Sequence, residues 1–156
     1  MRVVDANVLL YAVNETSPQH EASVGWLDDA LDGNDDVGFS WNALLAFIRI
    51  VTNSRILPRP LSAEDAMAQV HDWLAAPSAH VLQPGERHAM ILERLLVASG
   101  SAGNLVNDAH LAALAIEHRA GVVSFDADFA RFEGVRAKRP DELLKRPRDG
   151  ESRANR

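Results

Sequence analysis

Apolar and polar positions alternate along this chain in a way that predicts short buried strands separated by longer helices. Runs of three or four apolar residues are typical of strands buried on both faces, whereas apolar positions three or four apart indicate amphipathic helices. The expected strands are 2–4, 37–39, 80–82 and 121–124, with Val135 as a possible start of a fifth strand. The expected helices are 8–13, 17–31, 40–53, 62–77, 86–98, 104–118 and 126–132. This alternation predicts an α/β fold with a mostly parallel sheet and helices on both of its faces.

Acidic residues stand where two of these strands end and where one helix begins. Asp5 follows Val3 and Val4, while Asp126 and Asp128 follow the strand 121–124. Asp108 lies in the first turns of an alanine-rich helix, and the small alanines allow that helix to pack closely on the sheet. Because open α/β sheets present their ligand sites at the carboxyl ends of strands, we expect the four carboxylates to converge there.

Such a cluster favours a divalent cation, because carboxylates at close range repel one another and raise each other's pKa values. Mg²⁺ and Mn²⁺ are hard cations that prefer oxygen ligands. We therefore predict that Asp5, Asp108, Asp126 and Asp128 are catalytic metal ligands. Asn7 and Ser124 adjoin these acids and are expected to orient their carboxylates as hydrogen-bond donors.

Each acid also has a purely structural explanation. Asp5 could cap the following helix, although Asn7 can do so as well, and Asp108 suits the positive end of its helix dipole. Asp126 and Asp128 could simply form a turn. His110, near the acids, is expected to line its helix and not to act as a base. The three tryptophans, Trp26, Trp41 and Trp73, fall in apolar helical patterns and are expected in the core.

The composition narrows the class of protein. The 156 residues, 47% of them hydrophobic, suit one domain that buries roughly 70% of its unfolded surface. There is no cysteine, which excludes disulfides and thiolate metal sites and fits a cytoplasmic location. No charged leader and no run of about 18 apolar residues is present, so we expect a soluble, unprocessed protein without membrane contact.

The charge is unevenly distributed. The formal net charge is -6, but residues 136–156 hold eight of the sixteen basic residues and only four acids. A basic tail on an acidic body could guide a polyanion toward a metal-masked site, or could be a solubilising, frayed terminus. We expect a nuclease-like domain in residues 1–142 and a basic, flexible tail in 143–156. The sequence contains no zinc-hydrolase helix, serine nucleophile elbow, Walker loop or dinucleotide-binding glycine pattern.

Four motifs, in order along the chain, resemble those of PIN-domain proteins of the VapC toxin type. They are Asp5-Ala6-Asn7-Val8-Leu9-Leu10-Tyr11, the helix from Trp41 to Thr52 with Phe47-Ile48-Arg49, the run from Asn107 to Ala115, and Ser124-Phe125-Asp126-Ala127-Asp128-Phe129. The resemblance spans about residues 1–142. It implies a three-layer α/β/α fold, an Mg²⁺- or Mn²⁺-dependent endoribonuclease, a homodimer, and inhibition by a cognate VapB-type antitoxin. Asp5, Asp108 and Asp126 match the family's acidic positions, with Asp128 as a further acid of many members.

One position departs from the family pattern. The family commonly has a glutamate three residues before an arginine in the helix after the second strand, and Ala46 stands there in this chain. The departure predicts weaker metal binding, or binding through Asp128 and water. Arg49 is a candidate contact to substrate phosphate or to a partner, with a salt bridge on the helix surface as the alternative.

The resulting hypothesis is hydrolysis of RNA phosphodiester bonds by a metal-activated water. RNA follows from the resemblance, because nothing in these residues distinguishes RNA from DNA. One rival is a nuclease-dead module that binds RNA or protein, supported by Ala46. The other is a phosphatase with an aspartate nucleophile. Such sites usually add a lysine, and the chain has only Lys138 and Lys145, both in its C-terminal part.

Overall fold

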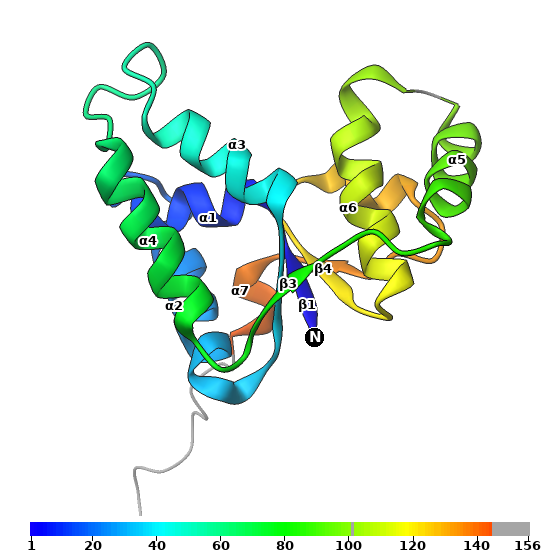
Figure 1. Ribbon diagram of the computed structural model, residues 1–156, viewed down its shortest axis with the longest axis horizontal. Coiled ribbons are helices and arrows are strands. Elements are labelled where there is room, and N and C mark those ends of the chain that lie inside the picture. The colour runs from blue at the N-terminus through cyan, green and yellow to red at the C-terminus, as the bar shows by residue number, and fades with distance from the viewer. Residues whose placement is uncertain (101, 145–156) are drawn as a thin grey trace, which may run out of the picture.

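A five-stranded parallel sheet forms the centre of the computed structural model, which describes residues 1–100 and 102–144 (Figure 1). The strands are β1 (Arg2–Val4), β2 (Val37–Ser40), β3 (Ala79–Leu82), β4 (Gly121–Val123) and β5 (Ala137–Lys138). Their order across the sheet is β3-β2-β1-β4-β5, and every neighbouring pair is parallel. All carboxyl ends therefore meet at one edge of the sheet, as the sequence predicted.

Helices cover both faces of this sheet, which confirms the three-layer α/β/α architecture. One face carries α1 (Ala6–Val13), α2 (His20–Asp29), the π-helical turn η1 (Ala30–Asn34), α3 (Trp41–Val51), α4 (Ala63–Ala75) and α7 (Pro140–Leu143). The other face carries α5 (His88–Ser99), the 3₁₀ turn η2 (Gly103–Leu105), α6 (Val106–Glu117) and the 3₁₀ turn η3 (Ala127–Arg131). In Figure 1 the first group lies to the left of the sheet, and α5 and α6 lie to the right.

The two central strands are apolar because both of their faces are buried. Val3 and Val122 point into the core under α5 and α6, while Val4 and Val123 point into the core under α1 to α4. All four side chains are 0% exposed. Successive side chains of a strand face opposite sides, so a continuous run of valines fills both layers.

The predicted fifth strand was misplaced. β5 begins at Ala137, two residues beyond Val135, which is half-buried against the α5–α6 core. The backbone oxygens of Arg136 and Lys138 accept hydrogen bonds from Val122 N and Ser124 N at 2.8 and 3.0 Å. A two-residue exposed edge strand has no apolar alternation, so pairing with β4 alone decides where it lies. The short helix α7 was likewise not predicted.

The prediction that all three tryptophans are core residues was wrong for Trp41. Trp26 and Trp73 are 3% and 6% exposed, but Trp41 is 44% exposed. The buried face of α3 consists of Ala43, Leu44, Phe47 and Val51. At 100° per residue, Trp41 lies roughly 100° away from the centre of that face, on the flank of the helix.

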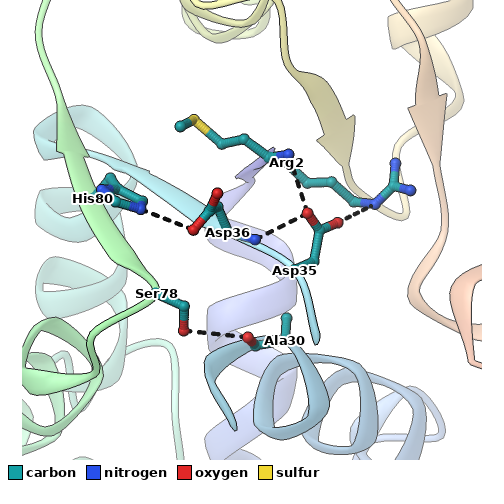
Figure 2. Close-up of polar contacts among 7 residues, drawn as sticks. Arg2, Ala30, Asp35, Asp36, Ser78 and His80 are labelled. Carbon is teal, nitrogen blue, oxygen red and sulfur yellow. Dashed lines mark hydrogen bonds and ion pairs between the residues drawn. The ribbon is translucent and has the colours of Figure 1, made fainter. Parts of the chain in front are cut away.

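Polar contacts close the edge of the sheet where the strands begin (Figure 2). The Arg2 Nε and the terminal amine of Met1 contact the two Asp35 carboxylate oxygens at 2.8 and 3.0 Å. The Ser78 hydroxyl donates to the backbone oxygens of Leu31 and Ala30 at 2.7 and 3.2 Å. These groups have structural partners and lie at the end of the sheet opposite the strand carboxyl ends.

The basic tail predicted for residues 143–156 lies outside the described residues from position 145 onward. Leu143 and Leu144, the last two described residues, pack against the core under α1 to α4. Within the described part of the chain, no helix is both long enough and apolar enough to span a membrane.

Candidate metal centre

The ends of β1 and β4 place Asp5 beside Ser124. The two strands pair in parallel with Val4 opposite Val123, and the Asp5 backbone N–H donates to Val123 O at 3.0 Å. The residues that follow each strand therefore leave the sheet side by side. The pairing of β1 with β4 thus brings Asp5 and Ser124 together, although 119 positions separate them.

Two side-chain donors hold the Asp5 carboxylate. Asp5 Oδ2 accepts hydrogen bonds from Ser124 Oγ at 2.6 Å and from Asn7 Nδ2 at 2.8 Å. Asn7 Nδ2 also lies 3.0 Å from Ser124 Oγ, and Asn7 Oδ1 accepts from Phe125 N at 3.3 Å. Asp5 occupies the N-cap position of α1, but its side chain makes no capping hydrogen bond to the helix. Its orientation is thus set by Ser124 and Asn7, the two residues expected to orient the acids.

The turn after β4 presents Asp126 and Asp128. Asp126 N donates to Ser124 Oγ at 2.9 Å, and Asp126 Oδ1 accepts from Asp128 N at 2.8 Å, which caps η3. Phe129, the next residue, is 0% exposed and anchors the turn in the core. The interpretation of this motif as a turn is therefore correct, and among the described residues the turn occupies only one of the two Asp126 carboxylate oxygens. Asp128 also pairs with Arg131 Nε at 3.0 Å.

Helix α6 brings Asp108 to the same place. Ala109, Ala112 and Ala113 are each 0% exposed, so the helix packs close to the sheet as its alanines predicted. Asp108, Asp126 and Asp128 each offer one carboxylate oxygen, and these oxygens all lie within 4.8 Å of one another. Asp5 is not one of the three, but its charge acts on Asp108 and it is acted on by Asp126.

The electrostatics of this cluster oppose full ionisation. Burial raises the pKa of Asp108 to about 6, with further contributions from the charges of Asp5, Asp126 and Asp128. Burial also raises the pKa of Asp5, although the hydrogen bond from Ser124 opposes that shift. Carboxylates gathered in this way at neutral pH are stabilised by a positive charge among them. The donors are all hard carboxylate oxygens, so the residues present suit Mg²⁺ or Mn²⁺.

The other residues singled out by sequence lie around this centre. Arg49 is exposed on α3 and makes no ion pair with any residue in the ranges 1–100 and 102–144. Ala46 is half-buried on the same helix. His110 faces α5, where its Nδ1 lies 2.9 Å from His88 Nε2, and His88 Nδ1 lies 3.1 Å from Glu117 Oε2. His110 lines the α5–α6 contact, as expected.

Sequence reasoning did not predict that the basic residues in and beside β5 lie near the acids. A cavity of about 620 Å³ adjoins Ser124 and Asp126, and Arg136, Lys138 and Arg139 contribute to its lining. The sequence signal was present in the basic character of the chain from residue 136, but that signal had been assigned to a tail.

Comparison with known proteins places this geometry in a family. The chain matches the PIN domain over residues 2–135. It is 61% identical over 144 residues to Ribonuclease VapC37 of Mycobacterium tuberculosis, covering 92% of this chain and 100% of that protein. It is 41% identical over 136 residues to Ribonuclease VapC33 of the same species, covering 87% of this chain and 95% of that protein.

Solved structures share the fold at low sequence identity. VapBC2 from Rickettsia felis, bound to a DNA fragment from its promoter, contains a chain with a TM-score of 0.66 at 18% identity, covering 88% of this chain and 97% of that one. A chain of VapBC-1 from nontypeable Haemophilus influenzae has a TM-score of 0.65 at 15% identity, covering 90% of this chain and 98% of that one. The fold, the order of the acidic motifs and the match over nearly the whole chain agree, and the chain belongs to the PIN-domain family, in its VapC branch.

Proposed function

We propose that this protein is a metal-dependent endoribonuclease and the toxin of a toxin–antitoxin pair. The observation that carries the proposal is the convergence of one carboxylate oxygen each from Asp108, Asp126 and Asp128 within 4.8 Å, where burial and then the neighbouring acids raise the pKa of Asp108 to about 6. The name ribonuclease, borne by relatives that are 61% and 41% identical over most of the chain, supports RNA as the substrate.

Each part of the centre has a task in this proposal. Asp108, Asp126 and Asp128 hold Mg²⁺ or Mn²⁺, with Asp5 as a fourth ligand on the side of β1. When bound, such a cation neutralises the carboxylates and lowers the pKa of a water to supply the nucleophile. Ser124 and Asn7 keep Asp5 oriented, and a carboxylate of the cluster orients the water for in-line attack on the phosphodiester. Arg49 remains a candidate contact for phosphate or for a partner.

The partner in this proposal is a VapB-type antitoxin that inhibits the enzyme. The structural neighbours include VapBC complexes from two bacteria and a FitAB complex bound to DNA, which supports a cognate antitoxin for this chain as well. A homodimer is also part of the proposal and is carried by the family resemblance. Co-expression with the product of a small neighbouring gene should then relieve any growth arrest that the protein causes.

The activity is tested by incubating the purified protein with a mixed pool of RNA and Mg²⁺ or Mn²⁺. We expect internal cleavage that depends on the metal and stops when a chelator is added. Inactivity with both metals, together with retained RNA binding, would favour the nuclease-dead module that Ala46 suggests. Release of phosphate from a chromogenic phosphomonoester faster than RNA cleavage would favour the phosphatase.

Replacing Ser124 by alanine is expected to reduce metal affinity and cleavage about 10- to 100-fold, the usual effect of removing a group that orients metal ligands. The hydroxyl donates to the Asp5 carboxylate and accepts from the Asp126 backbone N–H, so its loss loosens both Asp5 and the turn that carries Asp126. Mg²⁺ titration followed by thermal shift, and cleavage rates at saturating metal, measure the two effects.

The matched control is Ser78→Ala at the opposite edge of the sheet (Figure 2). Ser78 is 8% exposed and Ser124 3% exposed, and each bonds groups distant in sequence. Both variants should lose some stability, but Ser78→Ala should keep its metal affinity. Equal metal affinity in the two variants would remove Ser124 from the proposed centre.

A further inference from the structure

A cavity opens beside the metal centre, between the η3 turn, strand β5 and helix α7. Its volume is about 620 Å³, within the range of about 300 to 1,000 Å³ of small-molecule sites. Its apolar lining includes Phe125, Phe129 and Val135. A flat apolar group of the size of a nucleobase can be received there.

The polar part of the lining is mainly basic. Arg136 and Lys138 are exposed and form no ion pair with any residue that the structure describes. Their backbone oxygens are bonded to β4, which fixes the strand from which the two side chains project. Arg139, in contrast, is engaged, because its Nε contacts Asp141 Oδ1 at 2.9 Å and its guanidinium lies 5.0 Å from the Phe125 ring centre.

Two carboxylates stand against the three basic side chains of the lining, so its formal charge is +1. Glu142, which also lines the cavity, accepts a hydrogen bond from Arg139 N at 2.9 Å and is held at the start of α7. The other acid of the lining is Asp126, which belongs to the metal centre. Arg136 and Lys138, unpaired among the described residues, thus give this apolar cavity a net positive lining on a protein of net charge -6, an arrangement suited to an anionic ligand with a planar apolar part.

The cavity is continuous with the metal centre through two shared residues. Ser124 and Asp126 line the cavity, and Ser124 Oγ is bonded to both Asp5 Oδ2 and Asp126 N. A phosphate placed at the carboxylates would therefore have its neighbouring nucleotide at the mouth of the cavity.

We propose that this cavity is a binding subsite for one nucleotide adjoining the cleaved phosphodiester. The base lies against the half-buried Phe125 and Val135, and Arg136 and Lys138 contact the next phosphate along the strand. This inference rests on the proposed function, because it names where single-stranded RNA lies at the same centre. Stacking and backbone neutralisation together are the usual means of holding single strands.

The charge of the subsite is tested by RNA binding, with Asp108→Asn included in every variant so that the RNA is not cut. A labelled single-stranded RNA pool is titrated by fluorescence anisotropy against Arg136→Gln/Lys138→Gln and against a control, Arg87→Gln/Arg94→Gln, which also removes two exposed arginine charges but from the α5 region. We expect about tenfold weaker binding for the first pair and less than twofold for the control. The slope of log K against log salt should fall by about 0.7, because each phosphate neutralised on a single strand contributes about 0.7.

The cavity itself is tested without changing any charge. Ala130 is exposed on η3 and lines the cavity, so Ala130→Phe should fill it, whereas Ala98→Phe places the same side chain on the exposed surface of α5. Ala130→Phe should raise KM for RNA about tenfold with kcat nearly unchanged, and Ala98→Phe should change neither. A selective rise in KM is not expected from a general loss of folding.

Several results would overturn the subsite. If Arg136→Gln/Lys138→Gln and the control Arg87→Gln/Arg94→Gln weaken RNA binding equally, the effect comes from overall charge. An unchanged KM for RNA in Ala130→Phe would mean that RNA does not occupy the cavity. A changed oligomeric state, or lost binding of an antitoxin peptide with RNA affinity intact, would make the surface a protein contact. If the unaltered protein cuts RNA while these variants match it, only the subsite fails; if it cuts no RNA, the proposed function fails.

Discussion

Asp108→Asn is expected to lower metal-dependent RNA cleavage by at least about 100-fold, the upper end of the effect of disturbing a metal site through its supporting residues. Asp108 is one of three carboxylates that meet within 4.8 Å, and asparagine cannot supply the negative charge that neutralises a cation. Single-turnover cleavage of an RNA pool with saturating Mg²⁺ measures the loss. Wild-type cleavage by this variant would show that the activity comes from another site or from a contaminant.

The same substitution should leave the metal-free protein at least as stable as the wild type. The pKa of Asp108 in the folded protein is raised to about 6 from an ordinary value of 3.8, first by burial and then by the neighbouring acids. Protonation of Asp108 therefore favours the folded state, an effect fully present below about pH 3.8 and lost as the pH rises through about 6. At pH 7.5 the ionised carboxylate opposes folding, and asparagine removes that repulsion.

Thermal unfolding in the presence of a chelator tests whether ionised Asp108 lowers the stability of the folded protein. The melting temperature of Asp108→Asn relative to the wild type should increase between pH 4 and pH 7.5, and added Mg²⁺ should raise the melting temperature of the wild type only. Asp72→Asn, on the exposed surface of α4, is the matched control and should follow the wild type at every pH. If Asp108→Asn is markedly less stable than the wild type at pH 7.5 without metal, the ionised Asp108 carboxylate does not destabilise the folded protein and the prediction is wrong.

Phe129→Ala is expected to destabilise the protein by about 3 to 5 kcal/mol, the usual cost of removing a buried aromatic ring. Phe129 is 0% exposed, and its ring centre lies 6.1 Å from that of Phe132 in an edge arrangement. A loss of this size is a large part of a typical stability of about 5 to 15 kcal/mol. The side chain also anchors the η3 turn, so Asp126 and Asp128 should lose their fixed positions even in molecules that remain folded.

Urea unfolding and Mg²⁺ titration at low temperature separate the two consequences. Phe47→Ala is the matched control, because Phe47 is also 0% exposed but packs against Trp73 in the core on the other face of the sheet. Both variants should lose similar stability, whereas Mg²⁺ affinity per folded molecule should fall only in Phe129→Ala. Equal Mg²⁺ affinity in the two would mean that the acidic turn is held by its own hydrogen bonds and not by its buried ring.

The acids of the centre were predictable because each carries a local signal. Asp5 and Asp126 follow apolar runs that can only be buried strands, and Asp108 stands at the start of an alanine-rich helix. Parallel strands bring such positions to one edge of the sheet, so the parallel direction of the strands implied convergence at that edge, whereas the structure decided which strands are neighbours.

Local patterns by themselves determined the strands β1 to β4, the longer helices, the parallel sheet and the four acids. Only the tertiary structure decided that β5 begins at Ala137 and that Arg136 and Lys138 border a cavity beside Asp126. These features arise from contacts between residues far apart in sequence, or from pairing of a short exposed edge. Neither leaves an apolar period in the chain, and periodicity is the signal from which sequence alone can predict structure.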